Sequence, residues 1–500
     1  MQICRSMVRA FCLVLLIATV SRADEKFPRW QFRVSFPKEV QTEPFSGRVV
    51  LYLSQTRQQP RERLSWFNPE ILIGRDVTDW KPGEPLVIDS HKSDETTTCP
   101  KPIDQLNLAG WKVQAVARFN SWERKVGDGA GNGFSATAVV SSDASTIDLP
   151  ITQLIPERQF PENNWCKLLR VRSKLLSEFH KRDVFLQAAL LLPASYHKQP
   201  ERKYPVIFTI PGFGGTHFDG VRAEPINEQN EQGVEFIRLM LDPSCPLGHH
   251  VFADSANNGP WGTALVKEFI PELDKAFRTD SRPAARFLTG HSSGGWSSMW
   301  VMVSHPDDFA GTWSTSPDPV DFRDFQRINL YGGTDNMYSG RAGERRPIAR
   351  RGQQVLLWYG DFDVMEEALG TGGQLHSFEA AFSPRGSDGK PVRVWNRQSG
   401  AVNADAAKAW EPYDIRLVLE RNWSTLGPKL RGKLHVHMGD LDTFYLEGAT
   451  RLLGESLKKL DSDAVIEMHA GHDHGSLLTP QLMGRLRAEM VAKYLSAAKP

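Results

Sequence analysis

The sequence predicts an α/β protein with a doubly wound, mostly parallel sheet, preceded by a small β-sandwich-like domain. Three observations support this fold class. From residue 204 onward, apolar runs alternate with helical stretches, which is the pattern of βαβ units. Before residue 150, short alternating runs are separated by glycine and proline instead. At about 320–430 the alternation is lost over a stretch too long for an ordinary loop, which predicts a cap-like insertion.

The chain has 500 residues, more than one compact core usually holds, and its 40% hydrophobic content is that of a globular protein. We expect a β-rich N-terminal domain over 24–155 and an α/β domain over 156–500. A formal net charge of +1 provides no surface for a phosphate backbone, so we expect no nucleic-acid partner.

Residues 1–23 are predicted to be a secretory signal peptide. Arg5 and Arg9 precede an apolar run over 10–20 that is too short to cross a bilayer, and small residues suit a cleavage near Ala23. The alternative is an uncleaved membrane anchor. We therefore expect an exported protein, periplasmic or secreted, without stable membrane insertion.

Three cysteines, Cys99, Cys166 and Cys245, would remain after this cleavage. Because their number is odd, at most one disulfide can form within the chain. Their spacing matches no metal site, so buried or free thiols are the simpler interpretation.

The β-rich domain shows strand-like runs at 31–36, 47–53 and 111–117. A glycine-rich stretch at 127–133 lacks the spacing and the following helix of a nucleotide-binding fingerprint. This domain could bind a polymer, pack against a partner or brace the second domain. Nothing in its sequence looks catalytic.

The α/β domain is expected to begin with antiparallel edge strands, followed by a strand buried on both faces and then by alternating helices and strands. The expected strands are 171–176, 184–192, 204–210, 285–289, 433–438 and 464–468, and the expected helices are 231–241, 262–277, 294–304 and 480–497.

The insertion is expected to lie over the active site, with helical pieces at 374–382 and 413–423. Its large aromatic residues could line an acyl or aromatic pocket, or form the core of the cap itself, which is their commoner role. These residues are Trp358, Tyr359, Trp395, Trp410 and Trp423.

The candidate nucleophile is Ser292, in the motif Gly290-His-Ser-Ser-Gly294. This G-x-S-x-G pattern lies between a predicted strand and a predicted helix, the context of a sharp turn that exposes the serine hydroxyl. The residues two positions away must be small so that strand and helix can approach. The alternative is an ordinary turn that contains a serine by chance.

A serine hydroxyl needs an adjacent base, and that base needs an orienting carboxylate. Asp442 and His474 each follow a predicted strand and complete the order Ser, Asp, His. Asp440 competes for the acid, although as the first residue of its turn it suits capping of backbone amides. His472 competes for the base, and Gly475 favours His474 because a small residue lets the next helix start under the imidazole.

A tetrahedral intermediate needs two backbone N–H donors. One is expected from Ser293, directly after the nucleophile. The other is expected from the loop after strand 204–210, from Phe213 or else from Gly214.

A metal site is the alternative interpretation of the histidine-rich end of the chain. The residues that could together hold zinc or a metal pair are His435, His437, Asp440, Asp442, His469, His472 and His474. That interpretation leaves Ser292 and the glycine-rich loop at 212–215 unexplained, so we expect neither a metal nor another cofactor.

At these residues the chain resembles the broad putative-esterase family of α/β-hydrolases, which includes esterase D (S-formylglutathione hydrolase), enterochelin esterases, feruloyl esterases and mycolyltransferases. The similarity covers about 165–320 and 430–497, and the turns Gly439-Asp-Leu-Asp-Thr-Phe and Gly471-His-Asp-His-Gly resemble the acid and base turns of the esterase D branch. The resemblance implies an α/β-hydrolase fold, serine ester hydrolysis and no cofactor. The β-rich domain and the insertion are departures from a minimal esterase D, and export makes a glutathione thioester an unexpected substrate.

Together these features predict an exported serine esterase that acts through an acyl-enzyme on a small-molecule or glycan-linked ester. Acyl transfer or peptide hydrolysis on the same fold is an alternative, as is a non-catalytic glycan-binding or scaffold protein.

Overall fold

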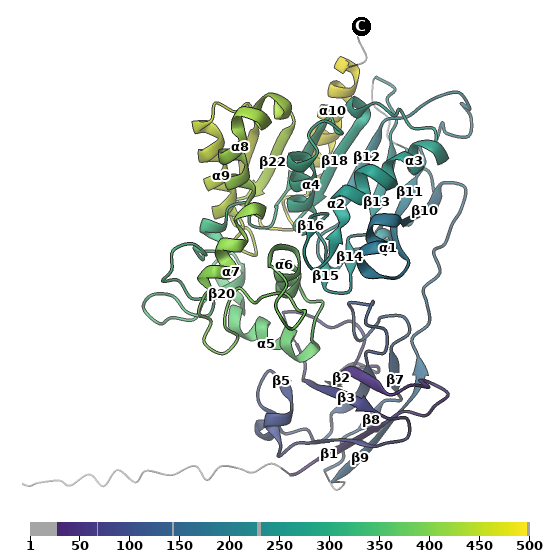
Figure 1. The fold of residues 1–500 in the computed structure, drawn as a ribbon, viewed down its shortest axis with the longest axis vertical. Helices are drawn as coiled ribbons and strands as arrows, with labels where there is room; N and C mark the ends of the chain where they lie inside the picture. Colours follow the sequence, from purple (N-terminus) through teal and green to yellow (C-terminus); the bar gives the residue numbers. More distant parts are fainter. Residues whose placement is uncertain (1–27, 68, 143–144, 228–231, 498–500) are drawn as a thin grey trace, which may run out of the picture.

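The computed structural model describes residues 28–67, 69–142, 145–227 and 232–497. It contains an α/β unit, an N-terminal sheet beneath it, and an insertion that lies beside both (Figure 1). The predicted signal peptide lies outside the described residues. Among the residues described, none of the helices combines the length and apolar character needed to cross a membrane.

The N-terminal region forms one continuous sheet in the order β4-β1-β9-β7-β6-β2-β3-β5, with β8 paired to β6. Side chains from β1, β4 and β9 and from β2, β3 and β6 enclose a common apolar core, so the sheet folds over on itself in a sandwich-like manner. Its strands are β1 (Gln31–Ser35), β2 (Phe45–Ser54), β3 (Leu72–Trp80), β4 (Leu86–Asp89), β5 (Thr97–Cys99), β6 (Lys112–Ala117), β7 (Gly133–Ser135), β8 (Ala138–Val139) and β9 (Thr146–Leu154).

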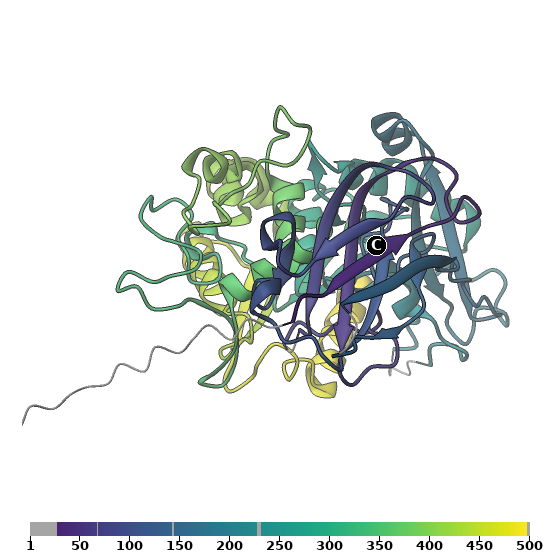
Figure 2. The same cartoon turned by 90° about the horizontal axis from the view of Figure 1, so that it is seen from below.

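Strand β2 is buried on both faces. Val49 and Leu51 point into the core of the N-terminal sheet. Val50 and Tyr52 belong instead to the core shared with the α/β unit. Successive side chains of a strand point to opposite faces, so this strand joins two cores. The view from below shows the N-terminal strands against the α/β unit (Figure 2).

Two arginines of the N-terminal sheet bind carbonyl groups of the rest of the chain. Nε of Arg48 donates to the carbonyl of Ala368 at 3.2 Å. Arg118 donates from Nη1 to the carbonyl of Thr371 at 2.7 Å and from Nη2 to that of Pro246 at 2.9 Å. Charge-assisted bonds of this kind are strong, and they hold the N-terminal sheet against the insertion and against the α/β unit.

The α/β unit contains an eight-stranded sheet in the order β10-β11-β13-β12-β18-β19-β22-β23. β10, β11 and β13 pair antiparallel and the remaining pairs are parallel. The predicted α/β-hydrolase sheet is thus confirmed. Its strands are β10 (Cys166–Ser173), β11 (Val184–Leu191), β12 (Val206–Ile210), β13 (Ile237–Leu241), β18 (Arg286–His291), β19 (Gly311–Thr315), β22 (Leu434–Gly439) and β23 (Val465–His469).

Helices cover both faces of this sheet. On one face α10 packs Leu486 and Met490 against Ile207 and Phe287. On the other, α4 contributes Trp296 to the main core. The helices of the unit are α1 (Lys174–His180), α2 (Trp261–Ala264), α3 (Ile270–Ala276), α4 (Ser293–Ser304), α9 (Glu447–Lys459) and α10 (Pro480–Ala497), and a π-helical turn, η4 (Leu265–Phe269), joins α2 to α3.

The predicted helix over 231–241 is wrong, because 237–241 forms strand β13 between β11 and β12. A short apolar run fits a buried strand or a buried helix equally well, and here pairing with two neighbours decides for the strand. Strand β19 was also missed. It is buried throughout, although threonine and serine make up three of its five residues.

The insertion lies between β19 and β22. It contains the hairpin β20 (Pro347–Arg351) and β21 (Gln354–Trp358) and the helices α5 (Tyr359–Leu369), α6 (Gln374–Phe382), α7 (Ala404–Ala409) and α8 (Ile415–Leu430). Arg397 is 9% exposed and lies 2.7 Å from Glu379 on α6 and 3.2 Å from both Asp363 and Glu367 on α5. This charged cluster ties α5 to α6.

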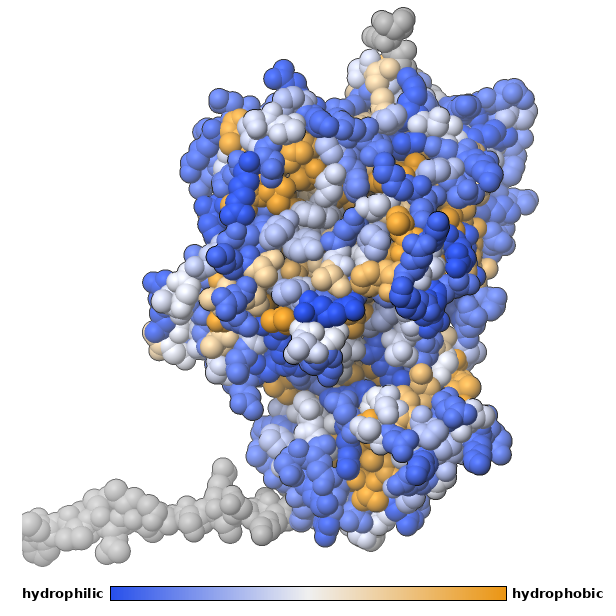
Figure 3. Space-filling model, viewed as in Figure 1, coloured by the Kyte–Doolittle hydropathy of each residue, from blue (hydrophilic) through white to orange (hydrophobic). Residues whose placement is uncertain are grey.

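Cys99, Cys166 and Cys245 are free and buried, so the described cysteines form no disulfide. The face of the molecule seen in Figure 3 is mostly hydrophilic, and hydrophobic patches are interspersed among the polar side chains.

Candidate active site

Ser292 lies in the turn between β18 and α4, with φ of 60° and ψ of −126°. A non-glycine residue pays a conformational cost in this region, and such strain is typical of functional turns. A Cβ added at Gly290 would lie 2.1 Å from the carbonyl oxygen of Gly294, and one at Gly294 would lie 1.9 Å from that of Ile210. Only glycine therefore fits at either position, which is the geometry of a nucleophile elbow.

Asp442 and His474 come from the turns that follow β22 and β23, and the fold brings them together. Nδ1 of His474 donates to Oδ2 of Asp442 at 2.7 Å, and Asp442 is fully buried. The backbone N–H of Phe444 donates to the other carboxylate oxygen at 2.8 Å. The imidazole is held between His291 and Phe444, whose rings lie 4.4 and 5.0 Å from it.

The competing residues lie elsewhere in the same turns. Asp440 accepts the backbone N–H of Gly471 at 2.7 Å, the capping role that its position in the turn suggests. His472 donates from Nδ1 to the carbonyl of Ser476 at 2.9 Å. Of the four candidates, Asp442 and His474 are the two that the fold pairs.

Burial alone would lower the pKa of His474, but the charge and hydrogen bond of Asp442, together with the charge of Asp318, outweigh it and raise this pKa above the usual value. Because Nδ1 donates to Asp442, the neutral imidazole leaves Nε2 free to accept a proton.

Ser292 and His474 line one cavity of about 270 Å³. In the described part of the chain the serine hydroxyl makes no hydrogen bond to the imidazole. Such bonds are often long in unliganded enzymes and shorten once substrate binds. The residues lining the cavity are Trp66, Gly212, Phe213, His291, Ser292, Asp318, Pro319, Gln326, Ile348, Leu357, Phe362, Gln374, Leu375, Phe378, Phe444, Leu446 and His474.

The two residues expected to donate to an oxyanion lie beside the nucleophile. Ser293 is the first residue of α4 and is buried. Phe213 lines the cavity, and its neighbour Gly212 comes so close that an added Cβ would lie 3.2 Å from Cβ of Ser292. The start of a helix also favours negative charge.

Sequence reasoning missed two polar residues of the cavity, Asp318 and Gln374. Oγ of Ser293 donates to Asp318 at 2.5 Å, and Nε2 of Gln374 donates to the same hydroxyl at 3.1 Å. Burial raises the pKa of Asp318 to about 6, although the bond from Ser293 opposes this. Oε1 of Gln374 is buried without a hydrogen-bond partner among the described residues. Asp318 follows strand β19, and a carboxylate after a core strand is a sign of a site residue. This sign could not be used, because β19 was not predicted from the sequence.

Trp66 was also missed, because it belongs to the N-terminal region. Its ring lies 5.5 Å from that of Phe213 and 5.1 Å from that of Phe362 on α5. These three residues are far apart in the sequence, and no local sequence pattern predicts their contact.

The five aromatic residues noted in the insertion lie outside this cavity. Tyr359, Trp395 and Trp410 are completely buried in the apolar core. The insertion lines the cavity instead with Ile348, Leu357, Phe362, Leu375 and Phe378, among others. These three therefore serve the apolar core, the commoner of the two expected roles, while Trp358 and Trp423 are half-buried.

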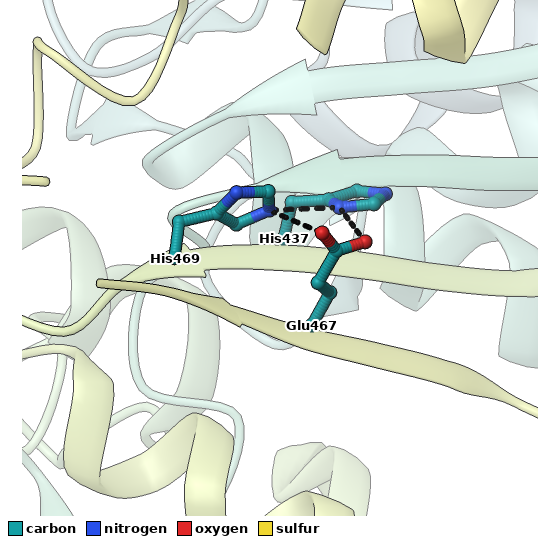
Figure 4. A group of neighbouring side chains, drawn as sticks. All are labelled: His437, Glu467 and His469. Carbon is teal, nitrogen blue, oxygen red and sulfur yellow. Dashed lines mark hydrogen bonds and ion pairs between the residues drawn. The ribbon is translucent and has the colours of Figure 1, made fainter.

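The seven residues considered as metal ligands do not form one cluster in the structure. Asp442 and His474 pair with each other, and His435 stacks on Trp313 at 4.6 Å. His437 and His469 meet Glu467, with ligand atoms within 4.8 Å of one another (Figure 4).

The position of Arg485 makes this last group a poor metal site. Its Nη2 lies 2.6 Å from Oε2 of Glu467 and already supplies a positive charge there. The same nitrogen lies 3.4 Å from Nδ1 of His437, one of the three atoms that would have to bind the metal.

The model of the Esterase family, described as "Putative esterase", matches residues 183–474. Among curated proteins none matches. Solved structures that are similar include a ferulic acid esterase, at 13% identity over 66% of this chain and 100% of that chain, with a TM-score of 0.42.

Two further similar structures are bacterial hydrolases. The S-formylglutathione hydrolase of Agrobacterium tumefaciens is 14% identical over 65% of this chain and 94% of that chain, with a TM-score of 0.37. A fluorophosphonate-binding serine hydrolase of Staphylococcus aureus is 13% identical over 65% and 98%, with a TM-score of 0.39. Because the family model covers more than half of the sequence, this chain belongs to the putative-esterase family.

Proposed function

We propose that this protein is an exported serine hydrolase that cleaves carboxylic esters through Ser292, His474 and Asp442. The observation that carries the proposal is the shared cavity. It brings a serine on a strained elbow and a histidine already bonded to a buried carboxylate to the same space. Family membership supports the reaction class.

In the first step the hydroxyl of Ser292 attacks the ester carbonyl while Nε2 of His474 takes its proton. Asp442 holds the imidazole in the correct tautomer and stabilises its charged form. The backbone N–H groups of Phe213 and Ser293 stabilise the oxyanion. Collapse of the intermediate releases the alcohol, which receives the proton from His474, and leaves the acyl-enzyme.

In the second step water attacks the acyl-enzyme, again with His474 as the base, and releases the acid. An acceptor alcohol in place of water would give acyl transfer with the same residues. The cavity presents apolar walls from Trp66, Phe362 and Phe378, so one part of the substrate is apolar and small enough for about 270 Å³. In this proposal the insertion acts as a cap, and the N-terminal domain supplies part of the substrate site.

The proposal is tested by hydrolysis of a 4-nitrophenyl ester series, from acetate to long acyl chains, with wild type and Ser292→Ala. We expect turnover by wild type alone and a chain-length profile that reflects the cavity. If a fluorophosphonate labels Ser292 but no ester of the series is turned over, the catalytic residues are functional and the enzyme requires a more specialised substrate. Failure of both would favour the binding-protein alternative, and faster cleavage of peptide substrates would favour a peptidase.

Export is tested separately, by fractionating the native host and measuring the mass of the mature protein. We expect a chain that begins near Asp24 outside the cytoplasm. A full-length chain held in the membrane fraction would favour the uncleaved anchor.

A further inference from the structure

A second cavity, of about 310 Å³, adjoins the candidate active site. The two cavities share Trp66 and Phe213 as a common wall. Three parts of the chain form the second cavity: two loops of the N-terminal domain (61–66 and 124–128), the loop after β12, and the end of α5 with the loop that follows it (365–373). We call this second cavity the basic pocket.

The charges of the basic pocket are mainly positive. Arg61, Arg63, Arg124 and Lys125 line it, against Asp128 and Glu366.

Both carboxylates already have partners. Asp128 lies 3.6 Å from Arg61, and Glu366 accepts the backbone N–H groups of Gln374 and Leu375 at the start of α6. Burial raises the pKa of Glu366 to about 7, so it is only partly charged near neutral pH. The pocket therefore carries an excess of positive charge.

Arg63 and Lys125 are exposed, and Arg124 is the half-buried cation of the pocket without a polar partner. It makes no hydrogen bond or ion pair with another described residue, and its Nη2 is buried without a hydrogen-bond acceptor. Its guanidinium lies over the ring of Phe213, 4.8 Å from the ring centre. Burial lowers its pKa below the usual arginine value, but an arginine remains protonated at neutral pH. A half-buried cation with a buried nitrogen that lacks a hydrogen-bond acceptor is costly unless an anion binds it.

Arg124 is also close to the nucleophile. A Cβ added at Gly214 would lie 3.9 Å from Nη2 of Arg124, and one added at Gly212 would lie 3.2 Å from Cβ of Ser292. Gly212 and Gly214 are two residues apart, which is at most about 7 Å along the chain. The span from Ser292 to Arg124 is therefore within the length of one small molecule that lies along the ring of Phe213.

We propose that the basic pocket binds a carboxylate of the ester substrate, with Arg124 as its main contact. The enzyme would then prefer esters that carry a second, acidic group. A guanidinium offers a planar fork of donors that matches a carboxylate. The wall also holds Asp128 and Glu366, which offset part of its positive charge, so one carboxylate of the substrate suffices as the counter-ion of Arg124. This inference rests on the proposed function, because it assigns the substrate of the same site.

The test uses matched esters. For an acid on the acyl side, 4-nitrophenyl hydrogen adipate is compared with 4-nitrophenyl hexanoate. For an acid on the alcohol side, 4-acetoxybenzoate is compared with its methyl ester. We expect the wild type to prefer the acidic member of one pair. Arg124→Gln should reduce that preference, the ratio of the two kcat/KM values, about tenfold to a hundredfold, which is the range for a hydrogen bond to a charged group.

Two further variants sharpen the result. Arg124→Lys should restore part of the preference, because it keeps the charge but loses the fork. Arg431→Gln removes the same charge from an exposed residue that precedes β22, at the opposite end of that strand from Asp442, and should keep the full preference. An unchanged ratio in Arg124→Gln would overturn the proposal, and so would a wild-type preference for a phosphorylated ester over the carboxylate.

A binding measurement separates this inference from the proposed function. Calorimetry with Ser292→Ala should detect 4-nitrophenyl hydrogen adipate or 4-acetoxybenzoate, with affinity lost when Arg124→Gln is added. If no ester is turned over and no probe labels Ser292, the proposed function fails. The calorimetric measurement then still tests whether the basic pocket binds a carboxylate. If neutral esters are turned over but neither acid binds, the pocket proposal fails alone.

Discussion

The turns that follow β18, β22 and β23 and the walls that surround them are built differently. The turns belong to one sheet, and each presents one candidate catalytic side chain at the end of its strand: Ser292, Asp442 and His474. The walls come from three parts of the chain that meet only in the folded protein, at Trp66, Phe213 and Phe362. We therefore expect the chemistry to depend on the turns of the sheet and the choice of substrate to depend on the walls.

Loss of the nucleophile is expected to have the largest effect. Ser292→Ala should lower kcat by several orders of magnitude, because removal of a triad member leaves only binding and oxyanion stabilisation. The melting temperature should change little, since no packed side chain is lost. Ser304→Ala, at the exposed end of α4, is the matched control. Comparable activity in wild type and Ser292→Ala would contradict the role of the turns.

Asp442→Asn is expected to lower kcat about 10³–10⁴-fold, because an amide no longer selects the tautomer in which Nε2 accepts a proton. Asp440→Asn is the control from the same turn, where the residue accepts a backbone N–H instead. Kinetics on one neutral ester compare the two variants. A larger loss in Asp440→Asn would reverse the assignment of the acid.

The stability of the cavity walls is expected to depend on the buried charged cluster of the insertion. Arg397→Met should reduce the free energy of unfolding by about 3–5 kcal/mol, because it leaves Asp363, Glu367 and Glu379 without their shared cation. Arg393→Met is the control, since Arg393 is 49% exposed and exposed pairs contribute about 0–1 kcal/mol. Denaturant unfolding measures both, and equal losses would remove the special role of the cluster.

Trp66→Ala is expected to lower kcat/KM for aromatic esters about threefold to tenfold, which corresponds to the loss of an aromatic contact. Acetate esters should lose less, because they leave most of the cavity empty. Trp122→Ala, also in the N-terminal region but outside the cavity, is the control. Equal losses on every substrate would indicate a general structural effect and no selectivity in this wall.

The smallest expected effect is a shift in pH dependence. His474 must be neutral to act as a base, and its pKa is raised, so kcat/KM should rise with pH through values above 6.5. The charge of Asp318 favours the protonated imidazole, so Asp318→Asn should move this limb to lower pH. A profile of kcat/KM against pH measures the shift. A limb that stays in place or moves upward would exclude this coupling.

Sequence patterns captured the parts of this protein that depend on local chemistry. The motif at 290–294 has a local cause, since a Cβ at Gly290 or Gly294 would collide with the neighbouring backbone. The candidate acid and base follow strands whose apolar pattern is clear. Strand β13 was mistaken for a helix because five apolar-rich residues do not distinguish the two periods.

The sequence by itself determined the α/β class, the insertion between two core strands and the set of reactive candidates. Only the tertiary structure shows that His474, and not His472, is hydrogen-bonded to Asp442. It also brought Trp66, Arg124, Asp318 and Gln374 to the site. The physical reason is the sequence separation of the contacts involved. Turn geometry depends on residues a few positions apart, whereas a pocket wall depends on how whole sheets and helices pack.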